Sequence, residues 1–237
     1  MDKKPALYES DFMRRVTGDT IRPGGIAITE KAVLLADLPQ KAHVLDVGCG
    51  SGMTMEFLAN KYAYSVTGID PSRILIDRAL ERNSKLNIIM GRGEKLPFAD
   101  HAFDGVISEC SLSVVDDVDL TLTEIGRVLK EKGKLMISDL YIKSDPRKQE
   151  VNNPVDGCLK GVITKDNITQ TLTKHNFSIN FWQDCSKYLT SLLCQMIMNN
   201  YSVQEFWSHV MNCDAHHLSC EVKYGYYLLI AEKNYHL

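Results

Sequence analysis

Apolar positions along the chain follow two patterns that alternate from residue 43 onward. Short apolar runs that suit buried strands occupy 43–47, 64–69, 87–90, 106–107 and 135–137. Between these runs, apolar residues recur every three or four positions, which is the spacing of a helix with one buried face. Such an alternation predicts an α/β fold with a parallel sheet and helices on both faces. The helical stretches are 53–62, 74–80 and one from Asp116 or Asp117 to about residue 129.

Boundary signals refine the ends of some elements. Residues 1–28 carry no clear period and are predicted to be irregular, with a turn at 22–25. Thr29 is predicted to cap a helix that runs to about Leu38, because a threonine hydroxyl can accept the first free amides of a helix. Gly133 is predicted to end the third helical stretch, since glycine favours helix C-termini.

Beyond residue 140 the pattern loosens and then returns to recognisable elements. Leucine, methionine and other apolar residues repeat at helical spacing over 189–197 and again after a capping box at 202–205. Most of these side chains are expected to pack internally. The expected elements are a helix capped by Thr164 that runs to about Lys174, a strand at 177–182, the two amphipathic helices, and a final strand at 225–231.

Residues 44–52 form the most informative stretch of the sequence. The strand ends in Asp46 and Val47, and glycines follow at 48, 50 and 52 before the next helix begins. A strand, a glycine turn and a helix form a nucleotide-binding unit in open α/β sheets, because side chains at the turn would block the ligand. The dinucleotide fingerprint requires a glycine where Met53 stands, and no P-loop lysine follows. An ordinary strand–helix turn is the alternative interpretation.

Asp70 strengthens the nucleotide interpretation. It ends the second predicted strand, about 20 residues after the turn, where an acid that binds ribose hydroxyls is expected. A helix cap before Pro71 and Ser72 is a second possible role, and the two roles are compatible.

Four motifs in order resemble class I S-adenosylmethionine (SAM) methyltransferases, above all the small-molecule branch around the ubiquinone/menaquinone-biosynthesis enzymes. They are 46–52, 68–70, Leu-Pro-Phe at 96–98 and Phe-Asp at 103–104, and the likeness covers roughly 41–141. The resemblance implies a Rossmann-like, mostly parallel seven-stranded sheet whose last strand is antiparallel. It also implies SAM as cofactor and S-adenosylhomocysteine (SAH) as product.

The resemblance further assigns roles within the motifs. It places the amino-acid end of SAM on the glycine turn, the ribose on Asp70 and the adenine on the loop at 92–97. Arg92 replaces an acid that the family often carries in that loop, so we expect it to stack on the base or to face solvent. The candidate cofactor-binding residues are Asp46, Gly48, Cys49, Gly50, Asp70, Pro71, Gly93, Glu94 and Ser108.

No catalytic residue can be assigned from the sequence, and three candidates follow from position. Glu109 and Cys110 come directly after the fourth strand, where Asn-Pro-Pro-Tyr of base and amide methyltransferases is absent. Cys158 lies between two glycines in a loop that faintly resembles the cysteine-bearing loop of arsenite methyltransferases. Cys213-x-x-His216-His217-x-x-Cys220 could bind a soft metal or metalloid, but its spacing is not the usual zinc pattern. Ordinary free thiols are the favoured interpretation, so no metal site is assigned.

Topology predicts how the chain is organised. Residues 1–237 are expected to form one domain, with a SAM-binding core at 29–184. The segment 1–28 and a helical insertion at 185–223 are expected to lie over the carboxyl ends of the strands, as lids on the site. Residues 224–237 provide the last strand and a tail.

Composition limits which classes of partner and which cellular compartment we expect for this protein. The net charge is −3 with no basic block, which argues against a nucleic-acid substrate. No apolar run reaches the ~18 residues of a membrane span, and residues 1–4 lead into no signal-peptide core. Seven scattered cysteines indicate free thiols in a reducing cytoplasm.

The expected function is a cytoplasmic SAM-dependent methyltransferase for a small-molecule acceptor. The alternatives are a non-catalytic SAM-binding module, a methyltransferase that acts on a thiol or a metalloid such as arsenite, and a nicotinamide-dependent oxidoreductase. The acceptor and the oligomeric state stay open.

Overall fold

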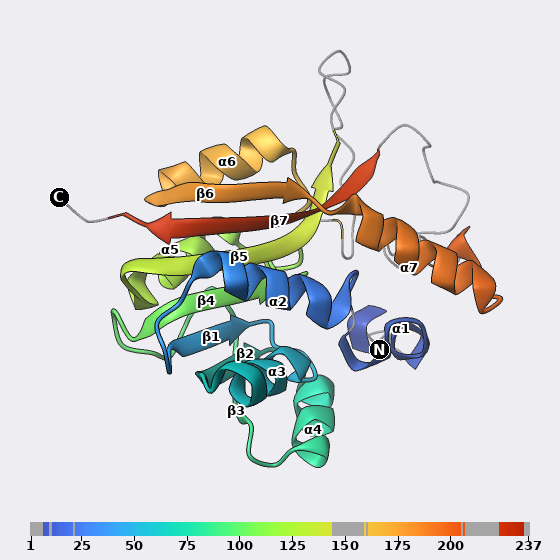
Figure 1. Cartoon of the computed structure of the whole chain (residues 1–237), viewed down its shortest axis with the longest axis horizontal. Coiled ribbons are helices and arrows are strands. Elements are labelled where there is room, and N and C mark those ends of the chain that lie inside the picture. Colours follow the sequence, from blue (N-terminus) through green and yellow to red (C-terminus); the bar gives the residue numbers. More distant parts are fainter. Residues whose placement is uncertain are drawn as a thin grey trace.

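A single seven-stranded sheet organises the computed structural model, which describes residues 7–9, 11–20, 22–143, 159, 161–204, 206 and 223–234 (Figure 1). The strand order is β3-β2-β1-β4-β5-β7-β6. Neighbours from β3 to β5 are parallel, whereas β7 runs antiparallel to both β5 and β6. The predicted mostly parallel sheet with an antiparallel last strand is therefore confirmed. The strands are β1 His43–Val47, β2 Ser65–Asp70, β3 Asn87–Met90, β4 Phe103–Glu109, β5 Leu129–Ile142, β6 Phe177–Asp184 and β7 Tyr224–Lys233.

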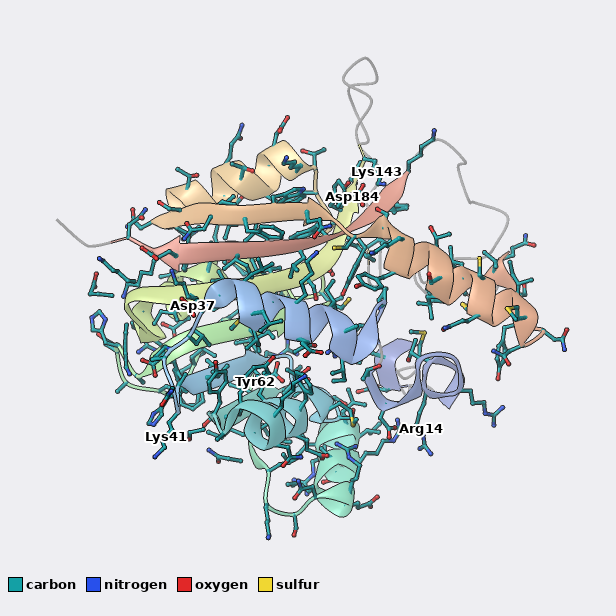
Figure 2. All side chains as sticks on the ribbon, in the orientation of Figure 1. Arg14, Asp37, Lys41, Tyr62, Lys143 and Asp184 are labelled. Carbon is teal, nitrogen blue, oxygen red and sulfur yellow. The ribbon has the colours of Figure 1, made fainter. Side chains whose placement is uncertain are left out.

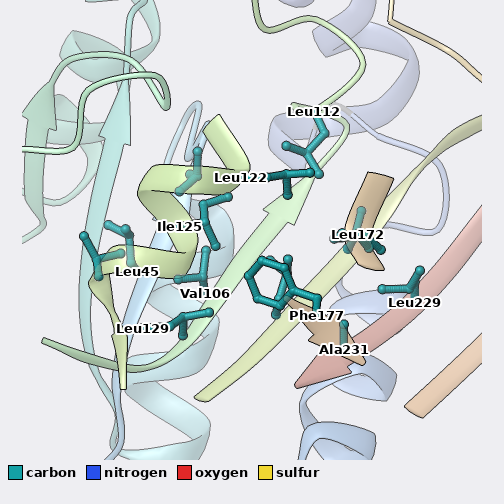
Figure 3. Close-up of a cluster of buried hydrophobic side chains, with 14 of the residues drawn as sticks. Leu45, Val106, Leu112, Leu122, Ile125, Leu129, Leu172, Phe177, Leu229 and Ala231 are labelled. Carbon is teal, nitrogen blue, oxygen red and sulfur yellow. The ribbon is translucent and has the colours of Figure 1, made fainter. Parts of the chain in front are cut away.

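Both faces of the sheet are buried under helices. On one face α5 (Val118–Val128) packs near β5 and α6 (Lys165–Lys174) packs against the edge strand β6, with Phe177 of β6 among their leucines and isoleucines (Figure 3). On the other face lie α2 (Gly25–Ala36) and α3 (Met53–Tyr62). Alternate residues of β5 and β7 enter opposite clusters, which explains why their apolar runs are continuous rather than alternating. The fourth helix, α4 (Arg73–Arg82), follows β2.

Side-chain caps begin three of these helices. The Asp117 carboxylate accepts the Leu120 amide and begins α5, and the Thr164 hydroxyl begins α6. These two caps were predicted from the sequence. Ser72 caps α4 by accepting the Leu75 amide, so the cap beside Asp70 is the serine.

The N-terminal segment differs from the expectation. It contains a 3₁₀ turn at Leu7–Glu9, helix α1 at Asp11–Thr17 and a second 3₁₀ turn at Gly18–Thr20, so it is not irregular. Helix α2 begins one turn before Thr29, with Gly24 at its N-cap in the left-handed conformation (φ 82°), and ends at Ala36 rather than Leu38. Thr29 is an interior helix residue, and its hydroxyl bonds a tertiary partner instead of the backbone.

Gly133 also lies in a different context. Helix α5 ends at Val128, and β5 starts directly at Leu129. Gly133 sits where the β4–β5 register shifts, and a Cβ there would lie 2.8 Å from the Lys130 carbonyl oxygen. The glycine is therefore explained by a close backbone approach within an irregular strand and not by a helix end.

Helices α1 and α7 (Ser186–Met198) lie beyond the carboxyl ends of the parallel strands (Figure 1). Arg14 of α1, Lys143 after β5 and Asp184 of β6 mark this end, whereas Asp37 and Lys41 mark the other (Figure 2). A separate apolar cluster joins Met13 of α1 to Leu192 and Met196 of α7. The lid role of 1–28 and 185–223 stays a prediction. The capping box at 202–205 is described only in part, because Glu205 lies outside the described residues.

Candidate functional site

The glycine turn after β1 uses backbone conformations that favour glycine. Gly48, Gly50 and Gly52 all have positive φ, at 75°, 50° and 75°. The amides of Gly48 and Cys49 donate to the Ile69 carbonyl at 2.8 and 3.2 Å, which ties the turn to β2. A Cβ on Gly48 would meet Ser111 Cβ at 2.4 Å, but one on Gly50 would find Leu75 Cδ1 as its nearest neighbour at 3.7 Å. The turn therefore packs tightly at Gly48, whereas at Gly50 a Cβ would make only an ordinary van der Waals contact.

Asp70 lies beside this turn at the end of β2. Its side chain is buried, and its Oδ2 accepts the Gly50 amide while its Oδ1 accepts the Ser72 amide, both at 2.8 Å. Burial raises the pKa of Asp70, and these two amide bonds oppose that rise. A carboxylate oxygen offers two lone pairs, so each oxygen can accept one more hydrogen bond. Asp70 is thus oriented for a ligand with paired hydroxyl groups.

Asp46, near the end of β1, is a second buried acid at this site. It is 2 % exposed, and its Oδ2 has no hydrogen-bond partner among the described residues. Burial, and next the charge of Glu109, raise the pKa of Asp46 well above its ordinary value. A buried acid with an unpartnered oxygen is unfavourable unless a ligand supplies a donor. The site fits a ligand that carries a positively charged amine.

Glu109 pairs with an arginine that the sequence did not single out. Arg22 Nη2 lies 2.8 Å from Glu109 Oε2, and both side chains are buried. The hydroxyls of Thr29 and Thr54 donate to the same carboxylate at 2.8 and 2.7 Å. Three of the four lone-pair sites of this carboxylate therefore already face donors of the protein. The geometry therefore favours a binding or positioning role for Glu109 over a catalytic one.

Cys110 follows at the same edge in a left-handed backbone conformation (φ 52°). Its Sγ lies 3.3 Å from the Tyr226 hydroxyl, which donates to Ser138. Burial raises the pKa of the Cys110 thiol well above its ordinary value, so it is a thiol and not a thiolate near neutral pH. Cys158, Cys213, His216, His217 and Cys220 lie outside the described residues, so the catalytic proposal for Cys158 stays a prediction.

The loop after β3 connects to the start of α5. The Glu94 carboxylate accepts the amides of Asp116 and Asp117 at 2.8 and 3.3 Å. Arg92 is exposed and pairs with Asp116, which agrees with the expectation that it faces solvent. Gly93 packs closely on α5, since a Cβ there would lie 2.8 Å from Thr121 Cγ2.

The structure brings most of the predicted site residues to one edge. Asp46, Asp70 and Glu109 end or nearly end neighbouring strands β1, β2 and β4, and the glycine turn lies among them. Ser108 is fully buried, and its hydroxyl bonds Ser111, which in turn donates to the Val47 carbonyl. Ser111 therefore ties the loop after β4 to β1, and the Ser108 hydroxyl supports Ser111. Cys49 is buried, and Pro71 is exposed just before Ser72, the N-cap of α4.

Comparisons with known proteins agree with this arrangement. Residues 45–137 match the model of the methyltransferase domain family. An O-methyltransferase of Pyrenophora dematioidea is 28% identical over 199 residues, which cover 81% of this chain and 74% of the relative. The mouse 18S rRNA (guanine-N(7))-methyltransferase is 39% identical over only 84 residues, covering 34% of this chain and 30% of the relative. The chain covers 40% to 60% of four other curated relatives, two of them O-methyltransferases.

Solved structures show the same fold. Phosphoethanolamine N-methyltransferase 2 of Haemonchus contortus, in complex with S-adenosyl-L-methionine, aligns with a TM-score of 0.74 at 18% identity. The alignment covers 94% of this chain and 56% of that one. The sheet and helices described above are therefore those of a known methyltransferase structure.

Proposed function

This chain is a class I SAM-dependent methyltransferase, and on that premise we propose that it methylates a hydroxyl oxygen of a small organic molecule. The observation that carries the cofactor assignment is the buried, unpartnered Asp46 Oδ2 beside the glycine turn and an oriented Asp70. O-methyltransferases among the relatives support oxygen as the first acceptor atom to test.

The charges at the site support a cationic ligand. Three buried carboxylates, Asp46, Asp70 and Glu109, share this edge with the Arg22 guanidinium. SAM carries an ammonium and a sulfonium against one carboxylate, so it offsets this excess of acids. The anionic pyrophosphate of a nicotinamide dinucleotide would instead face Asp46, which disfavours the oxidoreductase alternative.

Each group of the site has a separate task in this proposal. Asp46 and the turn at 48–50 hold the amino-acid end, Asp70 holds the ribose, and the loop with Gly93 and Glu94 borders the adenine. The bound cofactor supplies an electrophilic methyl group on its sulfonium. The protein then needs to place the acceptor in line and exclude water, and an acidic hydroxyl requires no strong base.

We further propose that the segments 1–28 and 185–223 cover the acceptor, that the acceptor is not a nucleic acid and that the protein works in the cytoplasm. The apolar cluster around Met13, Leu192 and Met196 supports a cover, and the net charge of −3 supports a small acceptor. Four described cysteines are free, which fits a reducing compartment. No helix within the described part of the chain is long and apolar enough to cross a membrane.

A binding and turnover experiment tests the function. We expect calorimetry to show binding of SAM and SAH and none of NAD, and we expect radiolabelled SAM to methylate a member of a panel of organic hydroxyl compounds. The panel includes amines, RNA and arsenite, because the likenesses to ubiquinone-pathway and arsenite enzymes stay predictions. NAD binding without SAM binding would contradict the cofactor. SAM binding without turnover on any acceptor would favour the non-catalytic module.

Binding should also release a proton. Burial raises the pKa of Asp46 well above its ordinary value, and an arriving ammonium favours the ionised form, so binding lowers this pKa. Affinity for SAH should therefore rise with pH until Asp46 is ionised without ligand. Calorimetry in two buffers of different ionisation enthalpy measures the release. Asp46→Asn should remove this proton release, and equal heats in the two buffers for the unmodified protein would refute the assignment.

A further inference from the structure

The side chain of Arg22 has the properties of a ligand-binding group. It is 8 % exposed, and both Nη atoms have partners. Nη2 donates to the hydroxyls of Thr29 and Thr54 and pairs with Glu109, and Nη1 donates to the Thr20 carbonyl. Its Nε, in contrast, is buried and has no hydrogen-bond partner among the described residues. An N–H group of a guanidinium is an obligatory donor, so burying it without an acceptor is unfavourable. A ligand that supplies an acceptor for the Arg22 Nε–H group would explain why this group is buried without a partner.

Asp46 complements Arg22. Its Oδ2 is a buried acceptor without a donor, and the Arg22 charge acts on Asp46 and opposes the rise of its pKa. The site therefore holds one unpartnered buried donor of positive charge and one unpartnered buried acceptor of negative charge. The α-ammonium and α-carboxylate of an amino acid match this pair.

We propose that Arg22 Nε donates a hydrogen bond to the α-carboxylate of the cofactor, while Asp46 Oδ2 accepts one from its α-ammonium. Glu109 is then a positioning residue that holds Arg22 and not a general base. This inference rests on the SAM site proposed above and adds the residue that distinguishes the complete cofactor from its decarboxylated form.

The surroundings of Arg22 preorganise it for this task. Thr29 and Thr54 each bond both Arg22 and Glu109, so α2, α3 and β4 fix the plane of the guanidinium together. Two residues later, Gly24 lies against the Tyr188 ring of α7, where a Cβ would approach Cγ to 2.9 Å. Helix α7 of the predicted lid therefore supports the turn that carries Arg22.

A carboxylate on the methyl acceptor would offer Arg22 the same chemistry. The experiment separates these sources because it measures cofactor binding without any acceptor. Three ligands are compared by calorimetry: SAH, its decarboxylated analogue, which keeps the amine, and 5′-methylthioadenosine, which lacks the whole amino-acid end.

For the unmodified protein we expect decarboxylation of SAH to lower the affinity by at least about tenfold, the size typical of a lost hydrogen bond to a charged group. Arg22→Gln should lower SAH affinity by a similar factor. The same variant should leave binding of the decarboxylated analogue and of methylthioadenosine within about twofold. Arg14→Gln is the matched control, because Arg14 belongs to the same N-terminal segment but is 56 % exposed, and it should bind all three ligands normally.

Glu109→Gln tests the positioning role. This variant should lower the affinity for SAH more than the affinity for the decarboxylated analogue, because the substitution displaces Arg22. If Glu109 were instead a general base, the variant would change turnover and leave SAH binding intact. Equal losses for all three ligands in Arg22→Gln, or equal affinity of the unmodified protein for SAH and its decarboxylated analogue, would overturn the proposal. The last measurement needs no variant, so a folding defect cannot obscure it. Absence of SAH binding to the unmodified protein would instead refute the proposed function itself.

Discussion

Replacing Asp70 by alanine is expected to weaken SAM and SAH binding by roughly 10²–10⁴-fold. The two ribose hydroxyls would each lose a hydrogen bond to a charged acceptor, worth about 1.5–3 kcal/mol apiece, and about 1.4 kcal/mol corresponds to a tenfold change. Asp70 also receives the amides of Gly50 and Ser72, so its removal loosens the glycine turn as well. Calorimetry with SAH measures the affinity, and thermal unfolding shows whether the fold survives.

Asp77→Ala is the matched control for this prediction. Asp77 lies on α4 close to Asp70 in sequence, but its side chain is 47 % exposed and pairs with Arg73 on the helix surface. Surface pairs of this kind contribute about 0.3–0.5 kcal/mol, so SAH binding should be unchanged. An Asp70→Ala protein that is folded and binds SAH within error of the unmodified protein would show that the ribose lies elsewhere.

The elements that local chemistry dictates were predictable. The runs of β1 and of β5 at 135–137 are buried on both faces of the sheet, so they read as continuous apolar segments. Asp117 and Thr164 cap helices within reach of their own side chains. The acids at the ends of β1 and β2 were likewise found, because the glycine turn fixes where the carboxyl edge of the sheet lies.

Features that depend on distant partners were not predictable. Thr29 has the residue type of a helix cap, yet its hydroxyl bonds Glu109, which lies 80 positions away in the sequence. Helix α2 instead begins at a left-handed Gly24, which offers no side-chain signal. Local patterns cannot distinguish these two uses of a threonine.

Arg22 illustrates the same limit for the site. In the sequence it is an arginine before a Pro-Gly-Gly turn, which is typical of an exposed loop. Only the fold buries it against Glu109 and leaves its Nε without a partner. The signal that could have identified it is an acid, Glu109, at the end of a buried strand, because such an acid requires a cation from another segment.

Gly50→Val is expected to abolish SAM and SAH binding while the protein stays folded. The nearest heavy atom to a Cβ at this position is Leu75 Cδ1 at 3.7 Å, so a Cβ meets no clash with the protein. The added side chain lies beside the amide that donates to Asp70, where the cofactor is proposed to bind, so the isopropyl group would take the place of the ligand. The left-handed backbone, at φ 50°, adds a strain of about 1–2 kcal/mol for a non-glycine residue.

Gly18→Val separates strain from occlusion. Gly18 has a similar backbone conformation, at φ 66°, and a Cβ there would meet nothing within 4 Å. This variant should therefore lose a comparable amount of stability in chemical denaturation and still bind SAH. If both variants bound SAH with the affinity of the unmodified protein, the space above Gly50 would not hold the cofactor. If both lost binding to the same extent, backbone strain rather than occlusion would explain the effect. Loss confined to Gly50→Val is the result that occlusion predicts, because only there does the added side chain occupy the volume that the ligand needs.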